Sequence, residues 1–438
     1  MQSIWENSVK LPSFIHLNKD TKTDVLIIGG GLCGILCAHM LKESGVDYIL
    51  TEADRICSGI THNTTAKITS QHGLIYNKLI QKFGTEKARM YLDANEAALA
   101  KFRKLAHSID CDFETKASYV YSLNDRLSLE EELDALRTLS FHAEFVRRPS
   151  IPINTAGAVK FNNQAQFNPL RFVAGIAKDL NIYEHTRVTE LIGTTAITRY
   201  GKIHADKIIV TTHFPFINKH GSYFLKMYQH RSYVLALDNA PNVDGMYVDE
   251  AKTGLSFRNY NNLLLLGGGS HRTGKSDGSY KELASFAKKY YPDANEVCHF
   301  ATQDCMTLDD VPYIGNYSKR TPNMYVATGF NKWGMTSSMA AATILRDIIL
   351  GNDNPYAPVF SPSRTMLRPQ LFVNAFESSV NLLTPTKPRC PHLGCALKWN
   401  SHERTWDCPC HGSRFTKDGK LIDNPATKDS RTIAPPHA

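Results

Sequence analysis

The first regular pattern along the chain is a continuous apolar run at residues 24–28, which has the length of a buried strand. A glycine-rich stretch, residues 29–34, follows it at once. Residues 35–44 carry apolar side chains at helical spacing, and a second apolar run at 47–50 has the length of another strand. The pattern therefore predicts a strand, a tight turn, a helix and a second strand, in that order.

The glycines of this turn follow the spacing G-x-G-x-x-G, at Gly29, Gly31 and Gly34. Between a strand and a helix, that spacing predicts a dinucleotide-binding site. Gly29 allows the tight turn, Gly31 lets a pyrophosphate approach the backbone, and Gly34 lets the helix pack on the strand. The N-terminus of the helix would face the negative charge of the pyrophosphate. Glu52, just after the second strand, is expected to accept hydrogen bonds from the adenosine ribose.

The rest of the chain changes character several times. Residues 77–143 have predominantly helical spacing, whereas residues 221–302 alternate like strands and include a buried run at 263–269. A further helix is expected at about 337–349. Residues 352–387 are rich in proline and predict a connector that is helical only in its middle.

Two short loops near the end of the chain each offer one cysteine and one histidine, as Cys390-x-His392 and Cys408-x-x-His411. Two thiolates and two imidazoles suit a Rieske [2Fe–2S] centre, in which the thiolates bind one iron and the imidazoles the other. A structural zinc site is the alternative, since it also uses such a ligand set. Zinc-finger spacing, however, pairs cysteine with cysteine and then histidine with histidine, which this order does not.

The cluster segment also resembles Rieske proteins of the respiratory type beyond its four ligands. The resemblance implies a disulfide between Cys395 and Cys410, which would pin the two loops together, and a hydrogen bond toward the cluster from Ser413. Phe415 stands where that family has a tyrosine, so one donor is lost, and we expect a reduction potential below the top of the Rieske range. The segment is also short for a Rieske domain, and we expect it to lean on the main body for support.

Residues 53–67 and 309–336 resemble segments of the D-amino-acid oxidase and glycine oxidase superfamily of FAD enzymes, which has putrescine- and sarcosine-oxidising relatives. In that family the first segment wraps the pyrophosphate and runs under the flavin ring, and the second ends in a helix whose N-terminus points at the flavin. The resemblance implies FAD as the cofactor. It also implies cofactor contacts from Ala53, Arg55, Ser58, Gly59, Thr61, Thr65, Ala66, Lys67, Val188, Gly329, Trp333, Gly334, Met335 and Thr336.

Two further residues are candidates from the same resemblance. Relatives bind the substrate carboxylate with an arginine on a strand just before a glycine run, and Arg258 is the candidate here. The alternative for Arg258 is a structural ion pair. Cys305 falls near the position where some sarcosine oxidases attach their flavin covalently, but we expect a buried free thiol.

The predicted fold class is α/β, with three parts. A discontinuous Rossmann-type FAD-binding domain takes up about residues 20–75, 150–220 and 303–351, and an α+β substrate domain about 76–149 and 221–302. Together they form an oxidoreductase region at 20–351, followed by a connector at 352–387. A small all-β Rieske [2Fe–2S] domain is expected at 388–438.

Composition narrows the classes of function. The chain has 438 residues and a formal net charge of +8, and its Lys and Arg residues are scattered, so no nucleic-acid partner is expected. No apolar run approaches bilayer length, and the N-terminal residues lack a secretion-signal pattern, which predicts a cytoplasmic protein without a membrane span. Six of its ten cysteines lie singly, unlike a disulfide framework. The oligomeric state stays open.

A flavin takes two electrons from a C–N bond as a hydride, whereas a Rieske centre carries one electron. Both on one chain predict a relay from an amine or amino-acid substrate, through FAD and the cluster, to an external electron acceptor. The reverse flow uses the same parts and stays open. The alternatives are an electron-transfer reductase whose substrate cleft is vestigial, and a redox-sensing protein that reports the oxidation state of the cluster to a partner.

Overall fold

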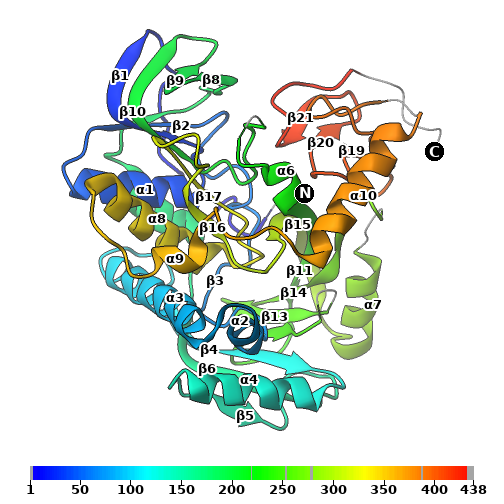
Figure 1. Ribbon diagram of the computed structural model, residues 1–438. Coiled ribbons are helices and arrows are strands. Elements are labelled where there is room, and N and C mark those ends of the chain that lie inside the picture. Colours follow the sequence, from blue (N-terminus) through cyan, green and yellow to red (C-terminus); the bar gives the residue numbers. More distant parts are fainter. Residues whose placement is uncertain (1–2, 219, 252–253, 277–279, 386–387, 432–438) are drawn as a thin grey trace.

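The computed structural model describes residues 3–218, 220–251, 254–276, 280–385 and 388–431, and within them the chain forms three β-sheets of eight, nine and four strands. The eight-stranded and nine-stranded sheets form the main body with their helices, and the four-stranded sheet is a small lobe beside it (Figure 1). The predicted α/β class, with a small all-β part at the C-terminal end, is confirmed.

The eight-stranded sheet contains the predicted dinucleotide fold. Its core is parallel, since β1 lies between β10 and β2, and β10 also pairs in parallel with β17. Residues 25–28 of β1 are buried on both faces, as expected for a parallel strand between helices. In spatial order the strands are β16 (Tyr313–Asn316), β17 (Met324–Thr328), β10 (Lys202–Val210), β1 (Thr21–Ile28), β2 (Tyr48–Thr51) and β7 (Ile182–Tyr183), and the hairpin of β8 (Glu190–Ile192) and β9 (Thr195–Ile197) extends from β10.

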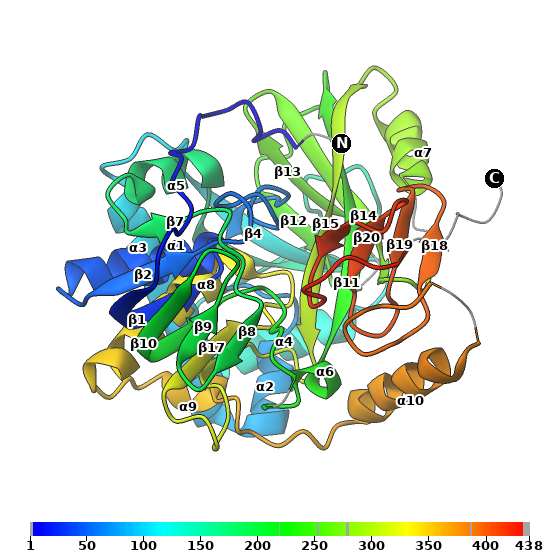
Figure 2. The same cartoon turned by 90° about the horizontal axis from the view of Figure 1, so that it is seen from above.

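The nine-stranded sheet is mostly antiparallel, and one end of it faces the small four-stranded lobe (Figure 2). In spatial order its strands are β15 (Asn295–Thr307), β11 (Met227–Asp238), β14 (Leu263–Arg272), β13 (Ser256–Tyr260), β12 (Met246–Asp249), β4 (Glu114–Ser122), β6 (Gly157–Gln166) and β3 (Lys67–Ile68), with β5 (Glu144–Val146) on β6.

The helices cover both large sheets, and two of them pack together against the dinucleotide fold. These are α1 (Leu32–Glu43) and α8 (Gly334–Leu350), which bury apolar side chains in one shared core. The other helices are α2 (Tyr76–Phe83), α3 (Thr85–Ala106), α4 (Arg126–Thr138), α5 (Pro169–Ala177), α6 (Tyr223–Lys226), α7 (Lys281–Tyr290), α9 (Ala357–Phe360) and α10 (Pro369–Leu383).

The expectation that residues 77–143 are predominantly helical is confirmed. Helices α2, α3 and α4 take up most of this segment, and strand β4 lies between α3 and α4. Strand β4 carries the β-branched and aromatic run Tyr119–Val120–Tyr121 and pairs with β6 over most of its length. That pairing is non-local, so apolar spacing within the segment does not reveal it.

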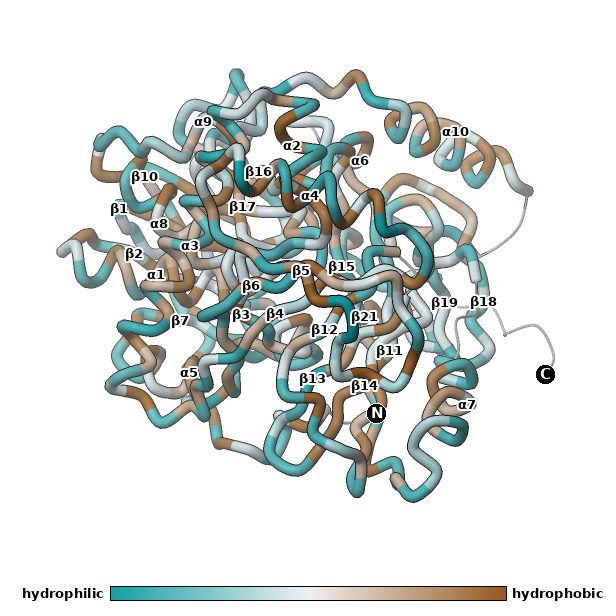
Figure 3. The backbone as a smooth tube through the Cα atoms, turned by 90° about the horizontal axis from the view of Figure 1, so that it is seen from below, coloured by the Kyte–Doolittle hydropathy of each residue, from teal (hydrophilic) through white to brown (hydrophobic). Residues whose placement is uncertain are grey.

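The connector contains α10, which is helical where the sequence predicts it and leads into the cluster lobe. The helix buries polar side chains and exposes apolar ones: Asn374 and Asn381 are buried, whereas Phe372 and Phe376 are 68% and 67% exposed. Figure 3 shows this helix at the periphery of the molecule, with hydrophobic residues along it. Arg389 bonds to carbonyl groups at the C-terminal end of the helix and so ties it to the first cluster loop.

The cluster lobe is built from the short strands β18 (Lys398–Asn400), β19 (Thr405–Asp407), β20 (Arg414–Thr416) and β21 (Leu421–Asp423). Trp399 and Trp406 face each other across its first hairpin, with ring centroids 5.1 Å apart. Within the described part of the chain, none of the helices combines the length and apolarity needed to cross a bilayer.

Candidate FAD and iron–sulfur sites

The turn between β1 and α1 has the shape that its glycines predict. Gly29 has a φ of +112°, a conformation that other residues rarely adopt. A Cβ on Gly34 would lie 1.9 Å from the Gly29 carbonyl oxygen, so only glycine allows the helix this close to the strand. A Cβ on Gly31 would meet only Thr61 Oγ1, at 3.6 Å, which leaves open space at the helix N-terminus. A phosphate group fits this space, since backbone N–H groups at a helix start attract anions.

Replacing Gly34 with alanine is expected to abolish FAD retention, because the new methyl group would push α1 away from β1 at the cradle. The measurement is the flavin-to-protein ratio of the purified protein. Gly45→Ala is the matched control: Gly45 has a φ of +70° and open space around it, so the change adds only backbone strain of about 1–2 kcal/mol. Full flavin content in Gly34→Ala would contradict the assignment of the cradle.

Glu52 lies at the end of β2, directly behind the turn. Its carboxylate accepts hydrogen bonds from the backbone N–H groups of Gly30 (2.7 Å) and Asp54 (2.9 Å). Burial raises the pKa of Glu52, while these N–H groups act in the opposite direction. The carboxylate therefore fixes the glycine turn and at the same time lines the cavity next to it.

A cavity of about 1270 Å³ runs from this turn to the nine-stranded sheet. Most of the residues that the sequence predicts for FAD line it, namely Gly29, Gly31, Glu52, Ala53, Arg55, Ser58, Gly59, Thr61, Thr65, Lys67, Val188, Gly329, Trp333, Gly334 and Met335. Segments that are far apart in sequence thus meet around one space. The start of α8 opens into it, and no side chain caps this helix end, so its N–H groups suit negative charge on a ligand.

The remaining predicted residues lie behind the cavity wall. Gly34 is at the helix–strand contact, and Ala66 is completely buried with a φ of +50°. Thr336 donates a hydrogen bond to the Thr69 carbonyl (3.0 Å) and contacts Nε2 of His72. His72 itself lines the cavity and stacks on Trp333, with ring centroids 5.0 Å apart. These contacts hold the walls in place.

Arg258 is not placed to bind a substrate carboxylate, so the sequence-based expectation needs correction. The side chain is completely buried and is absent from the described residues that line the cavity. Its guanidinium donates to the carbonyl groups of Thr65 and Ala66 and lies over the ring of Trp5. The residue points from β13 to the back of the loop at 64–66. Arg258 therefore positions this loop from behind.

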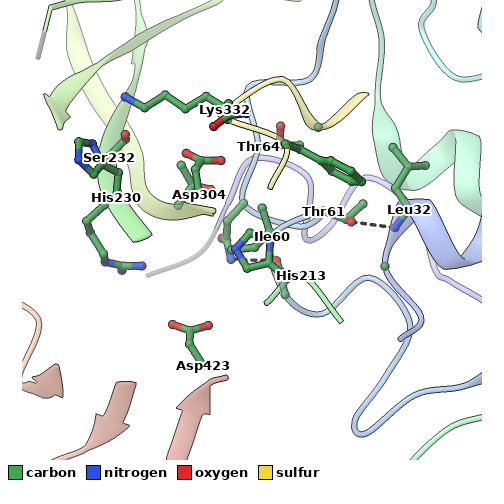
Figure 4. A pocket seen from close by; sticks show the side chains of 18 of the residues that line it. Leu32, Ile60, Thr61, Thr64, His213, His230, Ser232, Asp304, Lys332 and Asp423 are labelled. Carbon is green, nitrogen blue, oxygen red and sulfur yellow. Dashed lines mark hydrogen bonds between the residues drawn. The ribbon is translucent and has the colours of Figure 1, made fainter. Parts of the chain in front are cut away.

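The cavity wall opposite the glycine turn carries polar residues that the sequence analysis did not assign. Figure 4 shows His230, Ser232, Asp304 and Lys332 together on one side of the cavity, with Leu32 and Thr61 on the other. His230 and Ser232 belong to β11 and Asp304 to β15, while Lys332 precedes α8. Cys305, next to Asp304, is a buried free thiol as expected.

The two loops that carry the predicted cluster ligands have the same backbone pattern. The carbonyl groups of Cys390 and Cys408 accept hydrogen bonds from Gly394 and Gly412, each at 2.9 Å. The N–H of each cysteine also bonds to a carbonyl five residues further on, at 2.9 and 2.8 Å. Both glycines turn the chain with a φ near +80°, at +81° and +82°. Each loop therefore presents one cysteine and one histidine in a similar way.

The two predicted histidine ligands meet at the tip of the lobe, with ring centroids 5.0 Å apart. The Nδ1 atoms of His392 and His411 are buried, and no described residue makes a hydrogen bond to either. Nε2 of His392 lies 2.8 Å from Asn218 Oδ1, the kind of contact that orients a metal-binding imidazole. Burial lowers the pKa of His392 to about 3, so its ring is neutral, the form that binds metal. The rings therefore fit a cluster that is bound through Nδ1.

The cysteines of the lobe also converge, but the disulfide implied by the resemblance is not formed. Cys395 and Cys410 are both free thiols. Their sulfur atoms and that of Cys408 all lie within 4.8 Å of one another. A disulfide would need two sulfurs at about 2.05 Å. Cys390 meets Cys408 as well, so the two predicted thiolate ligands are adjacent.

Ser413 is fully buried next to these sulfurs. Its hydroxyl oxygen accepts a hydrogen bond from the Ala426 N–H (3.0 Å), and the side chain also contacts the Cys390 thiol. The hydroxyl proton is therefore available to Cys390. Phe415 is buried as well and supplies no such donor.

Ser413→Ala is expected to lower the reduction potential of the cluster. A hydrogen bond to a charged group contributes about 1.5–3 kcal/mol, which corresponds to about 65–130 mV for one electron. The donor favours the more negative, reduced cluster, so its loss shifts the potential downward. A potentiometric titration followed by EPR measures the shift, with the exposed Ser379→Ala on α10 as the control. An unchanged potential in Ser413→Ala would exclude the hydrogen bond.

The lobe leans on the main body as expected, through two buried glutamines. Gln229 of β11 donates to the His411 carbonyl (2.6 Å), and Gln303 of β15 donates to the Gly412 carbonyl (2.9 Å). Gln303 also donates to the side chain of Gln229, at 2.7 Å. The second cluster loop is thus held directly on the nine-stranded sheet.

A dinucleotide cradle, a large cavity and a lobe with two cysteines and two histidines together define a redox flavoprotein with an iron–sulfur lobe. The chain matches the FAD-dependent oxidoreductase family over residues 24–348 and the Rieske [2Fe–2S] domain over residues 372–434. It therefore belongs to the FAD-dependent oxidoreductase family of D-amino-acid oxidase type and carries a C-terminal Rieske domain. FAD and a [2Fe–2S] cluster are its cofactors.

Named relatives agree with both parts. A Bacillus subtilis (strain 168) protein named as the Rieske 2Fe-2S iron-sulfur protein YhfW is 34% identical over 99% of this chain and 97% of its own length. The gamma-glutamylputrescine oxidoreductase of Escherichia coli (strain K12) is 25% identical over 46% of this chain and 51% of its own. Among solved structures, glycine oxidase from Geobacillus kaustophilus has the same fold, with a TM-score of 0.65 and 18% identity, and covers 78% of this chain and 99% of its own.

Proposed function

We propose that this chain dehydrogenates an amine or amino acid with FAD and passes the electrons one at a time through the Rieske cluster to an external acceptor. When bound, FAD supplies hydride acceptance and the cluster supplies one-electron transfer. The fold-level likeness to glycine oxidase and the partial match to gamma-glutamylputrescine oxidoreductase support the substrate class.

One observation carries the relay: a single short loop touches both sites. Thr212, just after β10, lines the FAD cavity. Two residues on, the ring of Phe214 lies against both predicted histidine ligands, with centroid distances of 6.5 Å to His392 and 6.1 Å to His411. Asn424 of the cluster lobe donates hydrogen bonds to the carbonyl groups of Thr212 and Phe214. Direct contact of this kind supports electron transfer within one molecule.

The same proposal assigns the cofactor-binding residues. The cavity-lining residues named above bind FAD, with Gly34, Ala66, Thr336 and Arg258 supporting them from behind. Cys390, His392, Cys408 and His411 bind the cluster. We also propose the three-part division at about 351 and 387, and a cytoplasmic location, which the free state of all ten cysteines supports.

The surface beside the first cluster loop supports an acceptor that docks there. Leu393, next to His392, is 39% exposed, and the outward face of α10 adds Phe372, Phe376 and Leu383. Apolar patches of this kind favour association with a partner. The cluster would then lie between the flavin and the acceptor.

A panel of amines and amino acids, tested anaerobically against the holoprotein, checks the proposal. The expected result is loss of the flavin absorption with at least one compound, and steady turnover when an artificial one-electron acceptor is added. A reductase with a vestigial cleft, or a redox sensor, would show no flavin reduction by any small amine. Reduction only by a protein donor or by a nicotinamide would overturn the proposal in favour of these alternatives.

A further inference from the structure

Strands β11 and β15 hold the second cluster loop and also form part of the cavity wall, which residues of the cluster lobe such as Asp423 and Asn424 extend. Side chains on a strand point to opposite faces in turn. Gln229 and Gln303 bind the cluster lobe from one face. His230, Ser232 and Asp304 lie on the other face and line the cavity, with His230 directly opposite Asp304 in the strand pairing. The cavity therefore has a built polar wall on its far side from the glycine turn.

Asp304 is the exceptional member of this wall. Its carboxylate faces the cavity and accepts no hydrogen bond from any described residue. The side chain is half-buried and reaches the cavity, where a carboxylate without a hydrogen-bond partner favours a cationic ligand. Burial raises the pKa of Asp304 to about 6, while the charges of Lys332 and Arg231 act in the opposite direction. Arg231, which also lines the cavity, is already bonded to Glu403 of the cluster lobe.

Lys332 completes the wall with a positive charge. Its Nζ donates to Ser270 Oγ (2.7 Å), which in turn lies 2.7 Å from Ser232 Oγ. One carboxylate and one ammonium group thus lie on the same wall, together with serine hydroxyls.

We infer that Asp304 binds the ammonium group of the substrate. The inference rests on the proposed function and names the residue that recognises the amine. The substrate ammonium would rest on Asp304, at the cavity wall opposite the glycine turn. Asp304 would take one proton from the ammonium, and FAD, when bound, would supply the acceptor for the hydride that leaves as the C–H bond breaks. The C=N bond forms, and the product is an iminium ion.

Three ligands of nearly the same shape test the inference without turnover. tert-Butylammonium is a cation, 2-aminoisobutyrate a zwitterion and pivalate an anion, and none has an α-hydrogen to be removed. Each is titrated into the holoprotein, and the change in the flavin absorption spectrum gives the dissociation constant. The variants are Asp304→Asn and Lys332→Gln. The control is Asp244→Asn, because the Asp244 side chain is 84% exposed and pairs with Lys116 away from the cavity.

Wild type is expected to bind the cation and the zwitterion and to reject the anion. Asp304→Asn should weaken binding of both ammonium ligands by about 10–100-fold, the usual loss for a hydrogen bond to a charged group. Lys332→Gln should strengthen tert-butylammonium binding by about two- to fivefold, because a neighbouring like charge is removed. If the zwitterion weakens in Lys332→Gln, the natural substrate is an amino acid. If binding of the zwitterion is unchanged in Lys332→Gln, the natural substrate is a simple amine.

Unchanged tert-butylammonium binding in Asp304→Asn, or a preference of wild type for pivalate, would overturn the inference. If Asp304→Asn loses its flavin, the Lys332→Gln titration still tests the inference. Weaker binding of tert-butylammonium to Lys332→Gln would contradict an ammonium site at Asp304. Failure of the proposed function gives a different result. If tert-butylammonium binds in an Asp304-dependent way but no amine reduces the flavin, the ammonium site stands and the dehydrogenase activity is excluded.

Discussion

Glu403→Gln should lower the free energy of unfolding by about 3–5 kcal/mol, because it leaves a buried arginine without its counter-charge. The Glu403 side chain is 4% exposed and lies where the cluster lobe meets the nine-stranded sheet. It accepts hydrogen bonds from Arg231 (2.8 Å) and Tyr233 (3.1 Å) of the sheet and from Arg414 (2.6 Å) of the lobe. Chemical denaturation followed by cluster absorption and tryptophan fluorescence measures the loss.

Glu130→Gln is the matched control, since Glu130 makes an exposed pair with Arg126 on α4 that contributes about 0.3–0.5 kcal/mol. The pH dependence gives a second check. Burial alone would raise the pKa of Glu403, but Arg414 and Arg231 outweigh it and hold the pKa at about 2. The stabilisation is therefore present above the unfolded pKa of about 4.3 and is lost as the pH falls toward 2. The gap between wild type and variant should narrow from pH 5 to pH 3; a constant gap would contradict the ion network.

His411→Ala should remove the cluster and stop turnover with one-electron acceptors, while the flavin stays bound and remains reducible by substrate. Removal of one imidazole leaves an iron of the cluster short of a ligand. The His411 ring also packs on Phe214 and Phe224. Its removal is therefore expected to loosen the contact between the cluster lobe and the loop that follows β10. EPR, iron analysis and FAD content are measured on the same preparation.

The control for this prediction is His402→Ala, an exposed histidine in the same lobe, which should keep the cluster and full turnover. If His411→Ala turns over with the same one-electron acceptor at the wild-type rate, electrons leave the flavin directly and the cluster has another role.

Features encoded in short stretches of sequence could be predicted. The glycine turn is such a feature, because Gly29 and Gly34 act through contacts with their own strand and helix. The cluster loops are another: each closes on itself through one glycine, and the donors lie within four residues. The connector helix also follows from local spacing.

Features that depend on which distant segments meet could not be predicted. Arg258 lies on the predicted strand, but the side chain points behind the flavin loop, because the face of a strand depends on its pairing. Asp304 and Glu403 gave no local signal. Strand β15 brings Asp304 to the cavity wall, and the loop between β18 and β19 brings Glu403 to the buried interface between the lobe and the sheet. The Cys395–Cys410 pair was inferred from resemblance alone, and the two residues are free thiols here.

The most direct test of the account is rapid anaerobic mixing of the oxidised holoprotein with a reducing amine or amino acid, while the flavin and cluster absorption bands are followed together. The contact of Phe214 with both cluster histidines predicts that the flavin band bleaches first and that the cluster is then reduced at a rate independent of protein concentration. Cluster reduction before flavin bleaching, or a rate that rises with protein concentration, would contradict electron transfer from flavin to cluster within one molecule.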